Sequence, residues 1–207
     1  RVLFAIGSRA NYASCKAVVR ASIAAGLDVT ALAYASAVLP RYGEVANELA
    51  QECDTIRVAT HMEGGRPEDM VATCASSIGA VPDVLKRVRP DVVYVVGDRF
   101  EVLPVAYAAT LMNVRVAQQM AGELSGTVDE SIRHAITKLA QWQFCATEQA
   151  TQRVRQMGEA HAHNTGCPRL DLARPFLGLP RGRDILVIQH PVTTEWGQAE
   201  SQMRTTL

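Results

Sequence analysis

The sequence predicts an α/β fold in which helices cover both faces of a parallel β-sheet. Short apolar runs rich in β-branched residues alternate with longer amphipathic stretches, and glycine or polar turns separate them. The clearest run, residues 91–96, follows Pro90 and precedes Gly97. Regular alternation of strand and helix favours a parallel sheet, because each helix carries the chain back to the same end of the sheet.

The individual elements follow from these patterns in chain order. Strands are expected at the apolar runs, which are residues 2–6, 28–34, 55–58, 91–96, 115–119 and 144–146. Helices are expected in the stretches between the runs, at residues 11–25, 42–52, 68–88, 100–112, 130–140 and 149–157. Gly26 ends the first helix, and residues 61–67 form a polar, glycine-bearing loop.

The composition near the carboxyl end predicts a domain boundary. Residues 174–183 carry two prolines, two glycines and three arginines, which is typical of a linker. Residues 1–173 therefore form one domain. A buried strand at 184–189 and a helix at 195–206 then open a second α/β domain over residues 184–207. One strand and one helix cannot bury a core of their own, so this second domain is incomplete.

Charge and cysteine content exclude several classes of function. Lysine and arginine number 21, and so do aspartate and glutamate, so no large positive field is present to bind nucleic acid or a membrane surface. No apolar run approaches the roughly 20 residues needed to cross a bilayer. The five cysteines are scattered without a CxxC pair, which favours a reducing cytoplasm over a disulfide framework or a zinc site.

Ligands of open parallel sheets bind beyond the carboxyl ends of the strands, so the residues that follow each strand are the candidate site. Gly7 and Ser8 lead from the first strand into a helix start, and Arg9 adds a cation. Free amide groups beside an arginine suit a phosphate. An ordinary turn with a solvated arginine is the alternative.

Carboxylates follow two further strands. Asp98 comes directly after the strand at 91–96, which suits an acid or base, although an N-cap aspartate explains it equally. Glu123, Asp129 and Glu130 follow the strand at 115–119, where they would share a pocket and shift one another's pKa values. Asp129 and Glu130 would otherwise be helix-start acids.

Arg133 and the histidines are ambiguous on sequence alone. Arg133 and His134 belong either to the same pocket or to a solvated helix face. A lone histidine such as His190 is more often structural than catalytic. His161 and His163 have no evident third ligand and are interpreted as surface residues, so no metal site is predicted.

Taken together, six ordered segments carry a family resemblance that spans essentially the whole chain. They are GSRANY (7–12), PRYG (40–43), GDRFE (97–101) with LMN (111–113), DESIRHAITK (129–138), GCP (166–168) and QHPVTT (189–194). The chain resembles the hydrolysing UDP-N-acetylglucosamine 2-epimerases of sialic-acid-type biosynthesis. The segments SIRHAITK and QHPVTT are specific, whereas the glycine turn is not.

The resemblance implies a GT-B-like architecture of two Rossmann-like domains with a UDP-sugar in the cleft between them. It implies no metal or nicotinamide cofactor, and a homodimer or homotetramer. The family chemistry removes the C2 proton of the sugar, expels UDP from C1 to leave a glycal, and adds water to release N-acetylmannosamine.

Residue roles also follow from the resemblance. It makes Asp98, Glu123, Asp129 and His190 the catalytic candidates. The positions that match substrate-binding residues are Arg9, Arg99, Glu130, Arg133 and His134.

The loop after the strand at 115–119 departs from the family pattern. Family members carry His-x-Glu-Gly-Gly-Glu there, and this chain has Gln118 and Met120 where they have a histidine and a catalytic carboxylate. Methionine cannot transfer a proton. Three hypotheses remain open: Glu123 or Asp129 takes the role in the same reaction, the substrate is a modified UDP-sugar, or the protein binds nucleotide sugars without turnover.

Overall fold

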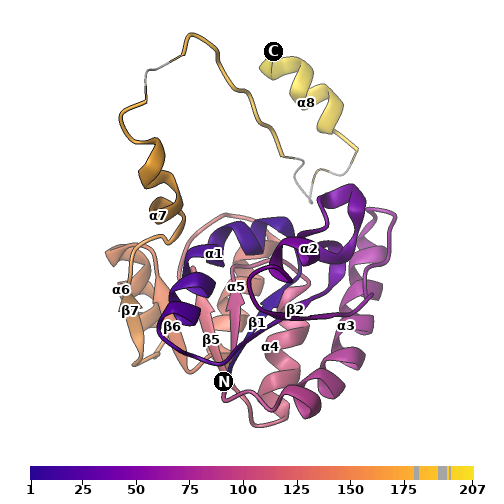
Figure 1. The fold of residues 1–207 in the computed structure, drawn as a ribbon. Coiled ribbons are helices and arrows are strands. Elements are labelled where there is room, and N and C mark those ends of the chain that lie inside the picture. Colours follow the sequence, from indigo (N-terminus) through magenta and orange to yellow (C-terminus); the bar gives the residue numbers. More distant parts are fainter. Residues whose placement is uncertain (180–181, 191–194, 196) are drawn as a thin grey trace.

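A computed structural model describes residues 1–179, 182–190, 195 and 197–207. Seven strands form one sheet in the order β3-β2-β1-β4-β5-β6-β7, and each neighbouring pair is parallel (Figure 1). Their bounds are β1 (Val2–Ile6), β2 (Val29–Ala33), β3 (Asp54–Arg57), β4 (Val92–Val96), β5 (Arg115–Gln119), β6 (Trp142–Cys145) and β7 (Ala162–Asn164). The predicted parallel α/β fold is confirmed, and its topology is Rossmann-like.

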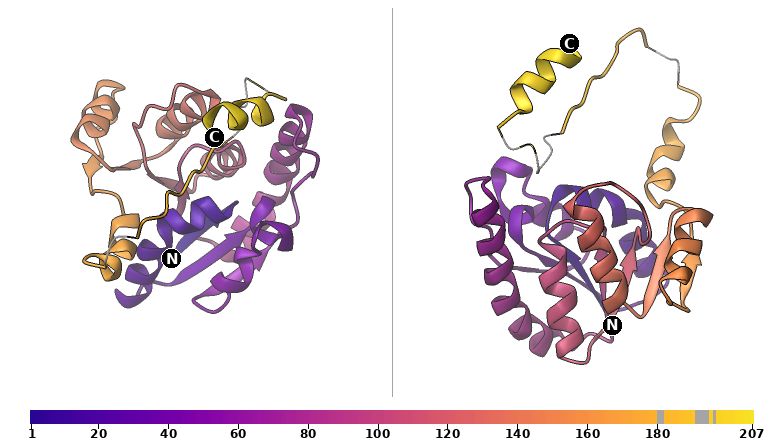
Figure 2. Two further views of the ribbon diagram at one scale, coloured as in Figure 1. Left: turned by 90° about the horizontal axis from the view of Figure 1, so that it is seen from above. Right: turned by 180° about the vertical axis from the view of Figure 1, so that it is seen from behind.

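Helices cover the two faces of the sheet. The α-helices are α1 (Arg9–Ala24), α2 (Val45–Leu49), α3 (Pro67–Val88), α4 (Val102–Leu111), α5 (Val128–Leu139), α6 (Glu148–Gln156), α7 (Arg169–Ala173) and α8 (Ala199–Thr206). Short 3-10 turns are η1 (Ala35–Val38), η2 (Pro40–Tyr42) and η3 (Arg174–Phe176). Helices α3, α4 and α5 stand side by side over one face of the sheet (Figure 2, right), and α1 and α2 lie on the opposite face.

The strands are buried on both faces, which explains their continuous apolar character. Successive side chains point to opposite faces, so β1 contributes to two separate clusters. Leu3 and Ala5 pack with the helices α3, α4 and α5, whereas Phe4 and Ile6 pack with α1 and α2. The strand order reverses at β1, whose neighbours are β2 and β4. Such a reversal opens a crevice at the carboxyl ends of these strands.

Some predicted elements differ in the structure. The helix expected at 42–52 is divided, because Gly43 and Glu44 take left-handed conformations, with φ of +92° and +41°, between η2 and α2. Strand β7 was not predicted: its sequence, Ala-His-Asn, lacks an apolar pattern and forms a strand by pairing with β6 at the sheet edge. His163 lies within β7 and is exposed, as the surface assignment expected.

The predicted strand at 184–189 is wrong for this chain. These residues are extended and unpaired (Figure 1), and Ile185 is 89% exposed by its accessible area. The physical reason is that no other strand in the described residues offers hydrogen bonds to this segment. The helix expected at 195–206 forms as α8, from Ala199. Parts of the predicted linker (180–181), of the QHPVTT segment (191–194) and of this helix (196) lie outside the described residues.

Candidate functional site

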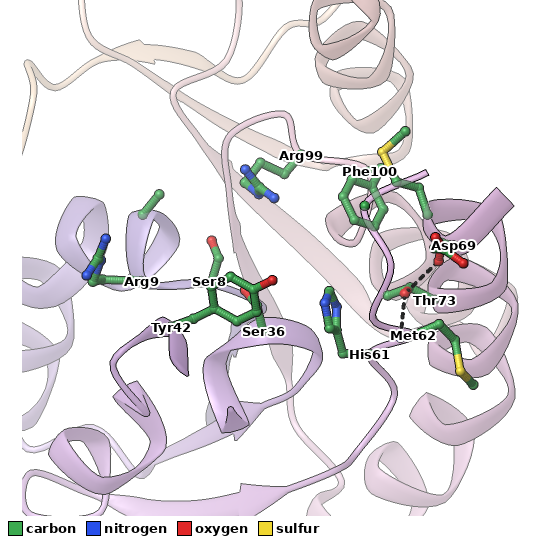
Figure 3. A pocket seen from close by; sticks show the side chains of 13 residues that line it. Ser8, Arg9, Ser36, Tyr42, His61, Met62, Asp69, Thr73, Arg99 and Phe100 are labelled. Carbon is green, nitrogen blue, oxygen red and sulfur yellow. Dashed lines mark hydrogen bonds between the residues drawn. The ribbon is translucent and has the colours of Figure 1, made fainter. Parts of the chain in front are cut away.

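A pocket of about 420 Å³ opens at the carboxyl ends of the strands on the β1 side of the sheet (Figure 3). It lies where the reversal of strand order predicts a ligand crevice. Its lining comes from the start of α1, the turns after β2, the loop after β3, the start of α3 and the segment after β4. The residues that reach it include Ser8, Arg9, Ser36, Tyr42, His61, Met62, Asp69, Thr73, Arg99 and Phe100.

The start of α1 is held in place at this pocket. The Ser8 hydroxyl accepts the backbone N–H of Asn11, and the Asn11 amide donates to the carbonyl of Val96 at 3.2 Å. These buried contacts tie the end of β1 to the end of β4. The first turn of α1 contains no acidic residue, and Arg9 is exposed there. The positive end of a 16-residue helix and an arginine therefore face the pocket together.

Arg99 contributes the second cation of the pocket. Its Nε donates to Glu101 at 2.7 Å, and its guanidinium lies between Ser8 and Phe100 in the close view (Figure 3). Across the pocket, His61 stacks edge-on against Tyr42 with ring centroids 5.8 Å apart. Burial lowers the pKa of His61, with Arg99 and Arg41 acting in the same direction against Glu63. The imidazole is therefore favoured in its neutral form near pH 7.

A second cluster lies on the β4 and β5 side of the same sheet edge, and Arg133 joins it together. The Arg133 side chain from α5 is buried and forms an ion pair with Asp98, which follows β4. It also donates to the backbone carbonyl of Glu123 at 2.6 Å. The solvated-face alternative for Arg133 is thereby wrong, because this residue is only 5% exposed. Arg133 instead connects three segments of the chain.

Asp98 and Asp129 come together at this edge. Burial raises the pKa of Asp129, and the negative charge of Asp98 raises it further, while Arg99 and Arg133 partly oppose the shift. Asp129 therefore holds its proton to a higher pH than an ordinary aspartate. Because Asp98 carries the ion pair with Arg133, the two carboxyl groups have different environments. Such a difference is typical of paired acid and base groups.

The other predicted residues have more structural surroundings. The Glu130 carboxylate accepts the backbone N–H groups of Ser125 and Gly126, both at 2.8 Å, and these bonds lower its pKa. It therefore closes the loop before α5. One carboxylate oxygen of Glu123 and Nε2 of His134 are buried without a hydrogen-bond partner among the described residues. Neither group has its hydrogen-bonding capacity met by the part of the chain that the structure describes.

Comparisons with known proteins identify the family. The chain matches the family described as UDP-N-acetylglucosamine 2-epimerase over residues 22–207. This chain belongs to the UDP-N-acetylglucosamine 2-epimerase family. It is 33% identical to the UDP-N-acetylglucosamine 2-epimerase of Neisseria meningitidis serogroup B, with 94% of this chain and 55% of that protein covered. It is 29% identical to the UDP-N,N'-diacetylbacillosamine 2-epimerase (hydrolyzing) of Legionella pneumophila, with 100% and 59% covered.

Solved structures of the epimerase family share the fold. The UDP-GlcNAc 2-epimerase of Neisseria meningitidis bound to UDP-GlcNAc superposes with a TM-score of 0.69 at 18% identity, covering 100% of this chain and 53% of that one. A putative family member from Listeria monocytogenes gives a TM-score of 0.72 at 18% identity, with 84% and 46% covered. The chain thus spans about half the length of the epimerases it matches.

The two positions where this epimerase-family chain departs from the pattern differ in surroundings. Gln118 is fully buried, donates to the Arg133 carbonyl at 3.0 Å and accepts from Thr137 at 2.7 Å. It ties β5 to α5 beneath the Arg133–Asp98 pair. Met120 has φ of +63°, a left-handed conformation that is unusual for a methionine. Its backbone N–H donates to the carbonyl of Phe144 on β6.

The predicted catalytic role of His190 gains no contact in this structure. His190 is exposed on the extended segment beyond η3, and among the described residues it forms no hydrogen bond with the site. The residues that follow it, 191–194, lie outside the described part. The structure brings Asp98 and Asp129 to one edge of the sheet, as the sequence predicted. It does not bring His190 to the same edge.

Sequence reasoning missed several pocket residues, notably Ser36, His61, Met62, Asp69 and Thr73. The rule that locates ligands after strand ends already pointed to His61 and Met62, which follow β3, but their loop has no motif. Within the described residues, no group of three histidine, cysteine or acidic side chains is placed to hold a metal ion. No helix there is long and apolar enough to cross a membrane.

Proposed function

We propose that this chain forms part of a hydrolysing UDP-N-acetylglucosamine 2-epimerase, which converts UDP-N-acetylglucosamine and water into N-acetylmannosamine and UDP. The supporting observation is the pair of unlike carboxyl groups, Asp98 and Asp129, beside an arginine-lined pocket at the strand-order reversal. Because the chain spans about half the length of its relatives, the activity belongs to the whole protein.

Two arginines and a helix start give the pocket its affinity for a diphosphate. Arg9 and Arg99 both line the pocket, and the α1 amide groups add partial positive charge. The diphosphate is the leaving group of the reaction, so these cations stabilise the charge that develops on it. In this proposal, residues 184–207 open a second α/β domain that brings His190 to the opposite side of the cleft.

The first half of the reaction is an elimination. Asp98 removes the proton from C2 of the sugar, the bond between C1 and the phosphate oxygen breaks, and a C1–C2 double bond forms. UDP leaves with the bonding electron pair. Arg133 holds the Asp98 carboxylate in position through its ion pair, and Gln118 and Thr137 support Arg133 from below.

The second half is a hydration. Water supplies a hydroxyl group to C1 and releases its other proton to solvent, while a proton reaches C2 from the opposite face, which inverts that centre. Asp129 is the acid that delivers this proton, because its raised pKa keeps the carboxyl protonated to higher pH. The product, N-acetylmannosamine, is the type of sugar used in sialic-acid biosynthesis in the cytoplasm. The resemblance also favours a homodimer or homotetramer.

A second candidate is the same chemistry on a more heavily acylated UDP-sugar. Two relatives act, by their names, on UDP- or GDP-N,N'-diacetylbacillosamine, from Legionella pneumophila and Campylobacter jejuni. The third hypothesis, binding without turnover, is motivated by Met120, which replaces a family carboxylate. All three hypotheses assign the same role to the pocket, which is to bind the diphosphate of a nucleotide sugar.

One assay separates these functions. The full-length protein is incubated with UDP-N-acetylglucosamine, and in parallel with UDP-N,N'-diacetylbacillosamine, while free UDP and free sugar are measured. We expect UDP and N-acetylmannosamine in equal amounts. UDP-N-acetylmannosamine without free UDP would instead identify a non-hydrolysing epimerase, and saturable UDP binding without any product would identify a non-catalytic protein.

A further inference from the structure

Glu101 is a carboxyl group buried directly beneath the pocket. It is 1% exposed, and one of its oxygens accepts a hydrogen bond from Nε of Arg99 at 2.7 Å. The other oxygen is buried without a partner among the described residues. Burial raises the pKa of Glu101 although the charge of Arg99 lowers it. A half-satisfied buried carboxyl group is costly, so its position calls for an explanation beyond stability.

The surrounding backbone leaves room for this one side chain. A Cβ on Gly7 would lie 2.6 Å from Cγ of Glu101 and 3.1 Å from the Tyr34 ring. Tyr34 in turn donates to the backbone carbonyl of Glu101 at 3.0 Å. Glu101 lies in the segment after β4. The residues at the ends of β1 and β2, which are distant in sequence, therefore enclose it.

Arg99 is anchored by only one side of its guanidinium. Its Nε donates to Glu101, and neither terminal nitrogen donates to a protein atom in the described part of the chain. The guanidinium of Arg99 therefore uses Nε to bind the buried carboxylate of Glu101. Its two Nη groups are left for the pocket that Arg9 also lines (Figure 3). An arginine without such an anchor would have to give up more rotamer freedom when it binds an anion.

We propose that Glu101 is a positioning residue that presents the Nη groups of Arg99 to the anionic diphosphate of the ligand. The proposal rests on the proposed function for the identity of the ligand. The positioning effect itself requires only that some anion binds in the pocket. A pre-oriented guanidinium loses less freedom when the anion binds, so affinity rises without any contact between Glu101 and the ligand.

Two substitutions separate positioning from stability. Glu101→Met keeps the length of the side chain and removes the acceptor, and Glu101→Gln keeps an acceptor oxygen for Nε. Removing one partner of a buried ion pair leaves the other uncompensated, so Glu101→Met is expected to cost stability, and Glu101→Gln less. A purely structural role for Glu101 predicts this loss of stability without a change in the anion affinity of the folded protein. Glu52→Gln is the matched control, because Glu52 also accepts from an arginine but lies away from the pocket.

The test is binding of inorganic pyrophosphate to the 207-residue chain, measured by calorimetry. We expect Glu101→Met to weaken binding on the order of tenfold, Glu101→Gln to weaken it less, and the control to leave it unchanged. In an Arg99→Ala background, Glu101→Met should have no further effect. Unchanged binding in Glu101→Met, an additive double variant, or no pyrophosphate binding by the unsubstituted chain would each overturn the proposal.

The outcome does not depend on turnover. If the full-length protein releases no UDP from any UDP-sugar, the proposed function fails while the pyrophosphate result for Glu101 stands. If turnover is found, Glu101→Met is expected to lower kcat/KM by at least a similar factor, because Arg99 binds the diphosphate in the substrate and also stabilises the charge that develops on it as it leaves.

Discussion

Asp98 illustrates how one side chain acquires a chemical role from its partner. An aspartate after a strand is commonly a helix N-cap, but Asp98 makes its ion pair with the buried Arg133 of a distant helix. Arg133 is bonded in turn to the loop after β5. The carboxylate is thus oriented by a network whose members come from two strand ends and α5.

Asp98→Asn should reduce turnover of the full-length protein at least about 100-fold, because an amide cannot accept the C2 proton. The matched control is Asp91→Asn, which lies next to the opposite end of β4. Turnover of both variants is measured by UDP release, and folding by circular dichroism. Turnover by Asp98→Asn equal to that of the control would remove Asp98 from the mechanism.

Gly122 is the glycine that the loop after β5 most clearly requires. Its φ is +76°, and an added Cβ would lie 2.4 Å from the Ala150 carbonyl oxygen and 2.7 Å from Val154. Gly26 has nearly the same φ, +75°, with open space around it. Gly122→Ala should therefore destabilise the chain by about 2 to 3 kcal/mol more than Gly26→Ala.

Urea unfolding of both glycine variants measures this difference. Equal losses of stability would show that only the left-handed conformation matters at Gly122, and that the close approach of α6 to the loop does not.

At the scale of elements, α1 is the helix that connects the pocket to the rest of the fold. Its first turn carries Ser8, Arg9 and Asn11 at the site, and its middle faces Glu52 after α2. The Glu52 carboxylate accepts from Tyr12 at 2.9 Å and from Arg20 at 2.7 Å. Burial raises the pKa of Glu52, but these hydrogen bonds outweigh it and hold the pKa below its usual value.

Glu52→Gln tests how α1 is attached. A carboxyl group with a lowered folded pKa stabilises the protein above its unfolded pKa, and that contribution disappears as the pH falls through the folded value. The substitution should therefore cost about 1 to 2 kcal/mol at pH 7, and the cost should shrink below about pH 4.5. Unfolding free energies of both proteins between pH 3 and pH 7 measure this, and a cost independent of pH would contradict it.

At the scale of the whole molecule, the sheet domain and the carboxyl-terminal segment differ sharply. The seven-stranded sheet has three apolar clusters of largely buried side chains, whereas Ile185, Leu186 and Ile188 are exposed on an unpaired segment. An exposed, extended apolar segment offers its backbone to other chains.

A chain ended after Leu179 should keep its fold and associate less. Helix α7 still packs against α1 in such a chain, through Arg169, which donates to Ser14 at 2.8 Å. We expect cooperative unfolding with a midpoint within a few degrees of the 207-residue chain, and a lower apparent mass by light scattering at equal concentration. Loss of cooperative unfolding would show that residues beyond 179 stabilise the sheet domain.

The sequence by itself determined the parallel sheet and the family. Strands buried on both faces are continuous apolar runs, and motifs such as SIRHAITK are read directly, so both are local properties of the chain. The same rule about strand ends located Arg9, Arg99, Asp98 and Asp129, because parallel strands bring their carboxyl ends to one edge.

Only the tertiary structure decided what those residues touch. The sequence allowed Arg133 to lie either on a solvated helix face or in the pocket, and its burial follows from the packing of α5 against α4 and β5. Gln118 stands where family members have a histidine, and the structure shows it buried with its amide donating to the Arg133 carbonyl. The space beneath Gly7 that admits Glu101 involves residues 94 positions apart. Hydrophobic periodicity indicates which face of a helix or strand a residue lies on. The side chain that the residue contacts depends on how distant segments pack across the sheet, and no local pattern encodes that packing.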